Sequence, residues 1–249
     1  MKSEWFKDWF SSKFYLDVYS HRNDLDAEKL LKLIQNNIEL TENAKILDVA
    51  CGNGRHSNYF AELGYNVVGF DLSNNLLKIA QKNNLESNSK INYFCADVRA
   101  IPLKSNFDLV LNLFTSFGYF YSDKENFSFI NFLSNHIKKN GYFVFDYLNP
   151  SFVKNNLVKT SERLVKEITI SEKRKIKNNR VEKEILISDS KNMHRFYESV
   201  QLYSFNEIIT VFKNNGFNAV NTFGNYSEDK YDENVSERMV IIFKRWKNI

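Results

Sequence analysis

Up to about residue 150, short apolar runs alternate with longer amphipathic segments. Short apolar runs bounded by turn residues are typical of buried strands, and apolar positions recurring every ~3.6 residues are typical of helices. The predicted strands are Lys45–Ala50, Asn66–Phe70, Ile91–Ala96, Asp108–Phe114 and Gly141–Leu148. The predicted helices are residues 3–20, Asp24–Leu40, Arg55–Leu63, Ser73–Asn84 and Lys124–Lys139. This order predicts an α/β fold with a mostly parallel sheet, because parallel strands need crossover connections that cover both faces.

The pattern changes after residue 153. Ile168–Lys177 and Arg180–Ile187 alternate as strands do, and Asn178-Asn179 between them tolerates the left-handed backbone of a two-residue hairpin. We therefore predict a small antiparallel β insertion at residues 154–203, acting as a lid or a dimer contact. Residues 1–153 are expected to form a helical cap and most of the core, and residues 204–249 the rest of it. Further predicted elements are a strand at Arg195–Tyr203, a helix at Ser204–Asn215 and antiparallel edge strands at Asn218–Phe223 and Met239–Lys244.

The hairpin register makes a checkable prediction about charges. It pairs Lys175 with Glu182, a favourable cross-strand contact. It also places Arg174 opposite Lys183, and two like charges in that position need a third partner.

Composition narrows the function classes without choosing one. Hydrophobic residues make up 43% of the 249 residues, enough to bury a full core. The net charge of +4 comes from 34 basic and 30 acidic residues, so a nucleic-acid partner is permitted but not indicated. Two cysteines are too few for a disulfide framework, and no apolar run reaches the ~18 residues of a membrane span. We expect a soluble, cytoplasmic protein with no membrane partner, and the histidine spacing predicts no metal site.

The strongest chemical signal is Asp48–Arg55 (DVACGNGR), directly after the first predicted strand. Glycines there let the backbone approach a ligand, and the helix that follows presents free N–H groups. Asp71 follows the next strand, where an acid can accept the hydroxyl groups of a ribose. Asp97 follows the third strand, where an acid can border an adenine. A nucleoside-containing cofactor is expected at this edge of the sheet.

Two cofactor classes compete for the loop. A dinucleotide fingerprint requires a third glycine, but Ser57 occupies that position. Asp48 would also lie beside a pyrophosphate, and two like charges ~4 Å apart cost about 4 kcal/mol at a partly solvated site. S-adenosylmethionine has no phosphate and carries a sulfonium and an ammonium group, so nearby carboxylates suit it. The methyl donor is favoured.

The segments ILDVACGNGRHS, VVGFDLS, FCADVR, FDLVLNLFTSFGYF and NGYFVFDYLN, in this order, resemble class I S-adenosylmethionine-dependent methyltransferases. They are especially similar to bacterial members with an ACGxGRHS loop, many of them without an assigned substrate. The resemblance covers essentially the whole chain. It implies a Rossmann-like methyltransferase fold, with a seven-stranded sheet whose last strand is antiparallel. It also implies S-adenosylmethionine as the cofactor and S-adenosylhomocysteine as the product.

The same resemblance implies which residues hold the cofactor. Gly52 and Gly54 would lie under the methionine part, and Asp71 would hold the ribose. Asp97 would border the adenine, and Arg22 is a candidate for the cofactor carboxylate. The full set of candidate cofactor-binding residues is Arg22, Asp48, Ala50, Gly52, Gly54, Asp71, Leu72, Asp97, Val98, Asn112 and Phe114.

The methyl acceptor is less constrained. The fourth strand lacks the Pro-Pro-aromatic step that enzymes methylating exocyclic amines of adenine or glutamine share, and Cys51 and Cys95 are placed as structural residues rather than nucleophiles. The candidate acceptor contacts, each of which could equally be a packing residue, are Tyr119, Tyr147, Asn149, Arg195, Tyr197 and Arg238. No general base is assigned, with His21 and Tyr147 the least unsuitable candidates. His56 is open to either a functional or a packing role.

Three functions stay open. The leading hypothesis is an enzyme, monomer or homodimer, that moves a methyl group to nitrogen or oxygen of a small molecule by direct displacement. The second is an RNA or protein methyltransferase that docks its substrate on the basic stretch Lys173–Arg180, which a continuous positive surface reaching the site would favour. The third is a non-catalytic module that binds S-adenosylmethionine.

Overall fold

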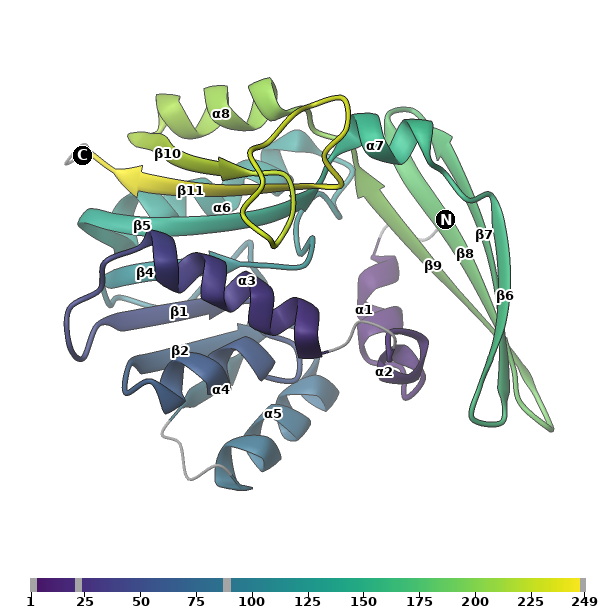
Figure 1. Ribbon diagram of the computed structural model, residues 1–249. Helices are drawn as coiled ribbons and strands as arrows, with labels where there is room; N and C mark the ends of the chain where they lie inside the picture. The colour runs from purple at the N-terminus through teal and green to yellow at the C-terminus, as the bar shows by residue number, and fades with distance from the viewer. Residues whose placement is uncertain (1–3, 21–23, 87–90, 247–249) are drawn as a thin grey trace.

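The computed structural model describes residues 4–20, 24–86 and 91–246, which form two β-sheets and the helices around them (Figure 1). The helices are α1 (Trp5–Phe10), α2 (Tyr15–Val18), α3 (Asp24–Asn37), α4 (Arg55–Glu62), α5 (Asn74–Glu86), α6 (Asp123–His136), α7 (Pro150–Asn155) and α8 (Phe205–Asn214). The main sheet contains β1 (Lys45–Val49), β2 (Asn66–Asp71), β3 (Asn92–Cys95), β4 (Phe107–Asn112), β5 (Ile137–Leu148), β10 (Phe217–Phe223) and β11 (Arg238–Arg245). The second sheet contains β6 (Thr160–Val165), β7 (Ile168–Lys177), β8 (Arg180–Ser188) and β9 (Met193–Gln201).

The main sheet has seven strands in the order β10-β11-β5-β4-β1-β2-β3. β1 to β5 are mutually parallel, and β11 runs antiparallel to both β5 and β10. This confirms the expected Rossmann-like fold with its antiparallel last strand. Because β1 to β4 are parallel, their carboxyl ends meet along one edge of the sheet, where ligands of such folds bind.

Helices cover both faces of the main sheet. The apolar face of α3 packs with Phe60 of α4 against Ile46, Leu109 and Ile242 on one side. On the other side, residues of α6 and α8 pack against alternate positions of the same strands, among them Phe143. The inner strands β1, β4 and β11 thus bury both of their faces, which explains why their residues form near-continuous apolar runs rather than alternating ones.

The second sheet is an antiparallel meander with the order β6-β7-β8-β9. The predicted hairpin is confirmed, since Asn178 and Asn179 turn with φ of 49° and 53° between β7 and β8. The register also holds, with Arg174 opposite Lys183. Strand β6 and helix α7 were not predicted, because Thr160–Val165 carries polar residues on both faces and gives no clear apolar pattern.

The second sheet stands beside the carboxyl edge of the main sheet, with α1 and α2 between them (Figure 1). Trp5, Phe6 and Trp9 of α1 are buried in an apolar cluster that includes Ile170 and Ile185 of the second sheet. The aromatic stripe at the start of the chain therefore joins the two sheets. A bilayer-spanning helix is not found among the described helices, which are too short or too polar.

Candidate active site

A cavity of about 920 Å³ lies between the two sheets. Its first wall is formed by the loops that follow β1, β2, β3 and β4. Aromatic residues of α1 and α2 form the second wall, and side chains of the second sheet form the third. The cavity therefore extends well beyond the loops that the sequence predicted to bind a cofactor.

The loop after β1 presents bare backbone to the cavity at Gly52. Its φ of 57° lies in the left-handed region, and a Cβ added there would meet no atom within 4 Å, so the space above it is open. Gly54, which is also predicted to lie under the methionine part, is not among the residues that line the cavity. A Cβ there would overlap the Tyr93 hydroxyl and lie 2.9 Å from the Ala80 Cβ, so this glycine is needed for packing.

Two buried carboxylates flank that loop. Asp48 is 1% exposed and accepts a hydrogen bond of 2.6 Å from the Ser57 hydroxyl, the residue that replaces the third glycine of a dinucleotide loop. Burial raises the pKa of Asp48 to about 7, and the negative charge of Asp71 adds to this rise. Asp71 accepts the backbone N–H groups of Gly52 at 2.9 Å and Ser73 at 2.8 Å, and burial raises its pKa as well. Among the described residues, neither carboxylate has an ion-pair partner.

Asp97 lines the cavity with Val98 but is held differently. Its carboxylate forms an ion pair of 2.6 Å with Arg99, whose hydrogen bonds lower the pKa of Asp97. Arg99 in turn contacts Glu125 of α6 at 2.8 Å. Asp97, the acid predicted to border the adenine, thus has a cation partner, whereas Asp71, the acid predicted to hold the ribose, has none within residues 4–20, 24–86 and 91–246.

The chain makes an unusual turn at the end of β4. Phe114 and Thr115 have φ of 53° and 63°, a conformation that costs a side-chain-bearing residue ~1–2 kcal/mol. Asp146, fully buried on β5, holds this turn by accepting the Phe114 N–H at 2.8 Å. Arg238 pairs with Asp146 at 2.6 Å and donates to the Thr115 hydroxyl at 2.9 Å. Arg238 lines the cavity as well, so this predicted acceptor contact also fixes the turn.

Two buried polar atoms beside the turn have no hydrogen-bond partner within the described chain. They are Nε2 of His56 and Oδ1 of Asn112, and both residues line the cavity. The His56 ring stacks on Phe114 with 5.2 Å between centroids. Burial, together with the charge of Arg55, lowers the pKa of His56 to about 3, so the ring is neutral at physiological pH. Unpaired buried polar atoms are costly and are typical of sites that a ligand completes.

The structure brings most of the predicted cofactor residues together. The cavity is lined by Asp48, Ala50, Gly52, Asp71, Leu72, Asp97, Val98, Asn112 and Phe114. Arg22 and the candidate base His21 lie outside the described residues. Tyr119, a predicted acceptor contact, lines the cavity and packs against Trp5, with 5.1 Å between the ring centroids.

Four other predicted acceptor contacts lie away from the cavity. Tyr147 is fully buried and donates to the Gln201 carbonyl, and burial raises its pKa, so the phenol stays protonated and is not suited to act as a base. Asn149 caps α7 and donates to the Ser236 carbonyl at 2.7 Å. The other two are Arg195 and Tyr197, which contact Glu184 across the second sheet.

The third wall of the cavity was not foreseen from the sequence. Ser161, Arg174, Lys183 and Glu198 line it, all from the second sheet. The strand pattern did not predict which face of the second sheet would turn toward the main sheet.

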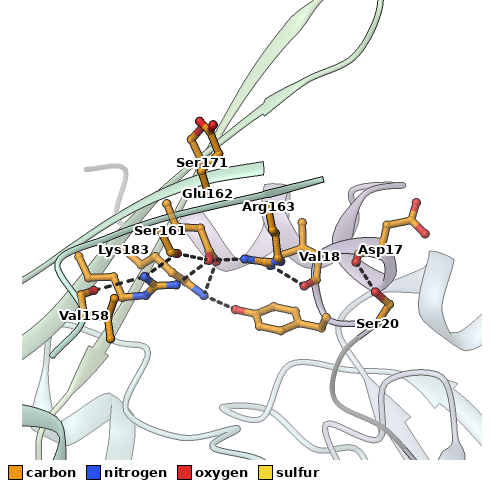
Figure 2. A network of polar contacts seen from close by, with 12 residues as sticks. Asp17, Val18, Ser20, Val158, Ser161, Glu162, Arg163, Ser171 and Lys183 are labelled. Atoms are coloured by element: carbon orange, nitrogen blue, oxygen red, sulfur yellow. Dashed lines mark hydrogen bonds and ion pairs between the residues drawn. The ribbon is translucent and has the colours of Figure 1, made fainter. Parts of the chain in front are cut away.

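Glu172 is the third partner that the Arg174–Lys183 pair requires. Its carboxylate, 3% exposed, lies 2.5 Å from Arg163, 2.5 Å from Arg174 and 3.6 Å from Lys183. Figure 2 shows the side chains of Arg163, from β6, and Lys183, from β8, converging from the two strands that flank β7. Burial alone would raise the pKa of Glu172, but the three cations outweigh burial and lower it to about 2.

Comparisons with known proteins agree with this geometry. Residues 46–141 match the family model described as a methyltransferase domain. A ubiquinone biosynthesis O-methyltransferase of Hydrogenovibrio crunogenus is 32% identical over 113 residues, 45% of this chain and 45% of that protein. A probable S-adenosyl-L-methionine-dependent methyltransferase TehB of Haemophilus influenzae is 27% identical over 106 residues, 43% of this chain and 33% of that protein. The chain therefore spans less than half the length of these curated relatives.

The matched region includes the β1 loop, Asp71, Asp97 and the turn after β4. They form the first wall of the cavity, which we call the cofactor wall because the sequence predicts the cofactor there. Residues 46–141 are thus similar to a methyltransferase domain. The crystal structure of an S-adenosylmethionine-dependent methyltransferase from Clostridium acetobutylicum superposes on this chain with a TM-score of 0.80 at 21% identity, covering 93% of this chain and 99% of the other, so the two share a fold. This likeness extends the fold agreement to the second sheet.

Proposed function

We propose that this protein transfers the methyl group of S-adenosylmethionine to a nitrogen or oxygen of a small molecule by direct displacement. The observation that carries the proposal is the cavity of about 920 Å³, in which the cofactor wall faces the second sheet across the aromatic residues of α1 and α2. A name that matches this reaction class, a ubiquinone biosynthesis O-methyltransferase, is found among the relatives.

The residues of the first wall fit the cofactor. Asp71 would accept the ribose hydroxyls, since each of its oxygens accepts one backbone N–H and keeps a second lone pair. The open backbone at Gly52 would lie against the methionine part, and the unpaired polar atoms of His56 and Asn112 would find partners there. S-adenosylmethionine supplies an activated methyl group on its sulfonium when bound.

The rest of the cavity would position the acceptor and exclude water. Trp5, Phe10 and Tyr119 form an aromatic side of it. Alignment of acceptor and methyl carbon can supply ~7–11 kcal/mol of the barrier without any covalent intermediate. No base is needed for an acceptor that arrives as a neutral amine. The neutral His56 ring is a better placed proton acceptor than Tyr147, which lies outside the cavity.

The basic stretch Lys173–Arg180 does not favour the RNA alternative. Strand alternation sends Lys173, Lys175 and Lys177 to the exposed face, where Glu182 pairs with Lys175 at 3.4 Å. Arg174 turns to the opposite face, and Arg180 is buried against backbone carbonyls such as that of Gly118 at 3.1 Å. The described residues of this stretch therefore form no continuous positive surface that reaches the cavity.

A labelled-donor screen across fractions of a cell extract tests the proposal. We expect label in a low-molecular-weight fraction and calorimetric binding of S-adenosylhomocysteine. Label transferred to bulk RNA or protein, with none in metabolites, would favour the second hypothesis. Binding without transfer to any fraction would favour a non-catalytic module.

A further inference from the structure

The inner face of the second sheet, which faces the cavity and α1, changes character along its length. Where it covers α1 it is apolar, with Ile170, Ile185 and Ile187 fully buried. Beyond them lies a set of charged residues that we call the charged belt, namely Arg163, Glu172, Arg174, Lys183 and Glu198. In Figure 2 the belt residues Arg163 and Lys183 lie on one face, and Glu162 and Ser171 point away from it.

Part of the charged belt has a structural task. Glu198 accepts the indole N–H of Trp9 at 2.6 Å and also the Tyr19 hydroxyl. Arg163 donates to the Val18 carbonyl at 2.8 Å. These two residues tether α1 and α2 to the second sheet, and that task accounts for them.

Arg174 does not tether α1 or α2 through any hydrogen bond described for it. Its described hydrogen bonds go to Glu172, to the Ser161 hydroxyl at 3.0 Å and to the Val158 carbonyl at 3.3 Å, all within the β6–β7 region. Its side chain is 23% exposed and lines the cavity together with Lys183, whereas Glu172 does not line it. The two cations thus line the cavity and share Glu172, and Lys183 also pairs with Glu198 at 2.6 Å and donates to the Tyr19 hydroxyl.

The charged belt also has one more cation than it has carboxylates, with three against two. Buried charges are costly unless they are paired, so an excess cation that lines a cavity is a candidate for pairing with an anionic ligand. Asp48 and Asp71 lie on the opposite wall, and among the described residues neither has an ion-pair partner. The cofactor wall thus carries two carboxylates without a described cation, whereas the wall formed by the second sheet, the sheet wall, carries the cations Arg174 and Lys183 with the acid Glu198.

We propose that the methyl acceptor carries an anionic group, a carboxylate or a phosphate, and that Arg174 and Lys183 bind this group. The inference rests on the proposed function and names the substrate class of the same site. The guanidinium of Arg174 can give a planar pair of N–H donors to two oxygens, and Lys183 adds a point charge. The anionic end of the acceptor is then held at the sheet wall, and its nitrogen or oxygen faces the cofactor wall.

Binding of simple anions tests this without knowledge of the acceptor. Protein saturated with S-adenosylhomocysteine is titrated with inorganic phosphate and, separately, with acetate, at constant ionic strength, and the apparent Kd is taken from the shift of the thermal midpoint. We expect one of the two anions to bind, and R174Q and K183M each to weaken it at least tenfold. The preferred anion distinguishes a phosphate-bearing acceptor from a carboxylate-bearing one.

The matched control is K175Q, which removes one positive charge from the neighbouring position on the opposite face and should leave the anion Kd unchanged. R174K keeps the charge and should recover part of the binding, which separates a lost contact from a disturbed fold. The proposal is overturned if wild type binds neither anion, or if K175Q weakens binding as much as R174Q. Affinity for S-adenosylhomocysteine is measured in the same samples, and its absence in wild type would contradict the proposed function rather than this inference.

Discussion

The two walls of the cavity bury carboxylates in opposite ways. On the cofactor wall, Asp48 and Asp71 are buried with no ion-pair partner in the described parts of the chain, and burial raises the pKa of both. On the sheet wall, Glu172 is buried among three cations, and its pKa falls to about 2. All three carboxylates have little contact with solvent, at 1%, 8% and 3% exposure for Asp48, Asp71 and Glu172, and at Glu172 the three cations outweigh the effect of burial on the pKa.

The difference teaches what each wall lacks. An acid whose ionised form is destabilised gains most from a ligand that brings positive charge or hydroxyl donors. A cluster in which cations outnumber acids gains most from a ligand that brings negative charge. The cofactor wall therefore fits the sulfonium and ribose of the methyl donor, and the sheet wall fits an anionic acceptor.

The largest expected effect comes from removing the charge of Glu172 in the sheet wall. Glu172→Gln leaves Arg163, Arg174 and Lys183 without their shared carboxylate, so we expect the free energy of unfolding to fall by about 3–5 kcal/mol. Urea denaturation of wild type and variant measures this difference in the free energy of unfolding. The control Glu182→Gln removes an acid that pairs with the exposed Lys175, and we expect a loss of ~1 kcal/mol or less. Equal losses in the two variants would show that the charged belt is not a buried network.

A smaller effect is expected on the cofactor wall. Asp71→Ala should remove a charge-assisted contact to the ribose of ~1.5–3 kcal/mol, which weakens the binding of S-adenosylhomocysteine roughly ten- to a hundredfold. Asp71→Asn keeps the shape of the side chain and tests whether the charge matters. Asp97→Asn should weaken binding less, because Arg99 already neutralises that carboxylate. Calorimetry that finds the reverse order would exchange the roles of the two acids.

Sequence patterns predict the cofactor wall well because its determinants are local. The β1 loop and the acids after β2 and β3 follow directly on strands, so their place at one edge follows from strand order alone. Even there, the sequence did not show that Gly54 is also constrained by packing, since the approach of Tyr93 is a tertiary contact.

The sheet wall was harder because its determinants are not local. The hairpin register was predictable from Asn178-Asn179. That register placed the two cations Arg174 and Lys183 opposite each other, but the sequence did not show which acid compensates them. Which face of the second sheet turns inward depends on its packing with α1, and no strand pattern contains that information. Asp146 was missed for the same reason, because its partner Arg238 lies 92 positions away in the sequence.

The smallest expected effect is a pH dependence of stability and cofactor affinity, which differs between the two walls. The pKa of Asp48 is raised to about 7 in the folded protein, against 3.8 for an ordinary aspartate, so the folded state holds a proton that the unfolded state has lost. The stability that this proton provides is present below about pH 4 and is lost as the pH rises through about 7. Glu172 acts in the opposite sense, but its stabilisation is lost only as the pH falls toward about 2.

Between pH 6 and pH 8, therefore, Asp48 on the cofactor wall should change its protonation state, and Glu172 on the sheet wall should not. Ionised Asp48 attracts a cationic ligand, so the affinity for S-adenosylmethionine should rise with pH, by at most tenfold per pH unit for one proton. The affinity for S-adenosylhomocysteine, which lacks the sulfonium charge, should rise less. Asp48→Asn should flatten both profiles in calorimetric titrations. A slope that persists in this variant would assign the titration to another group, and Asp71 would be the next carboxylate to replace because its pKa is raised too.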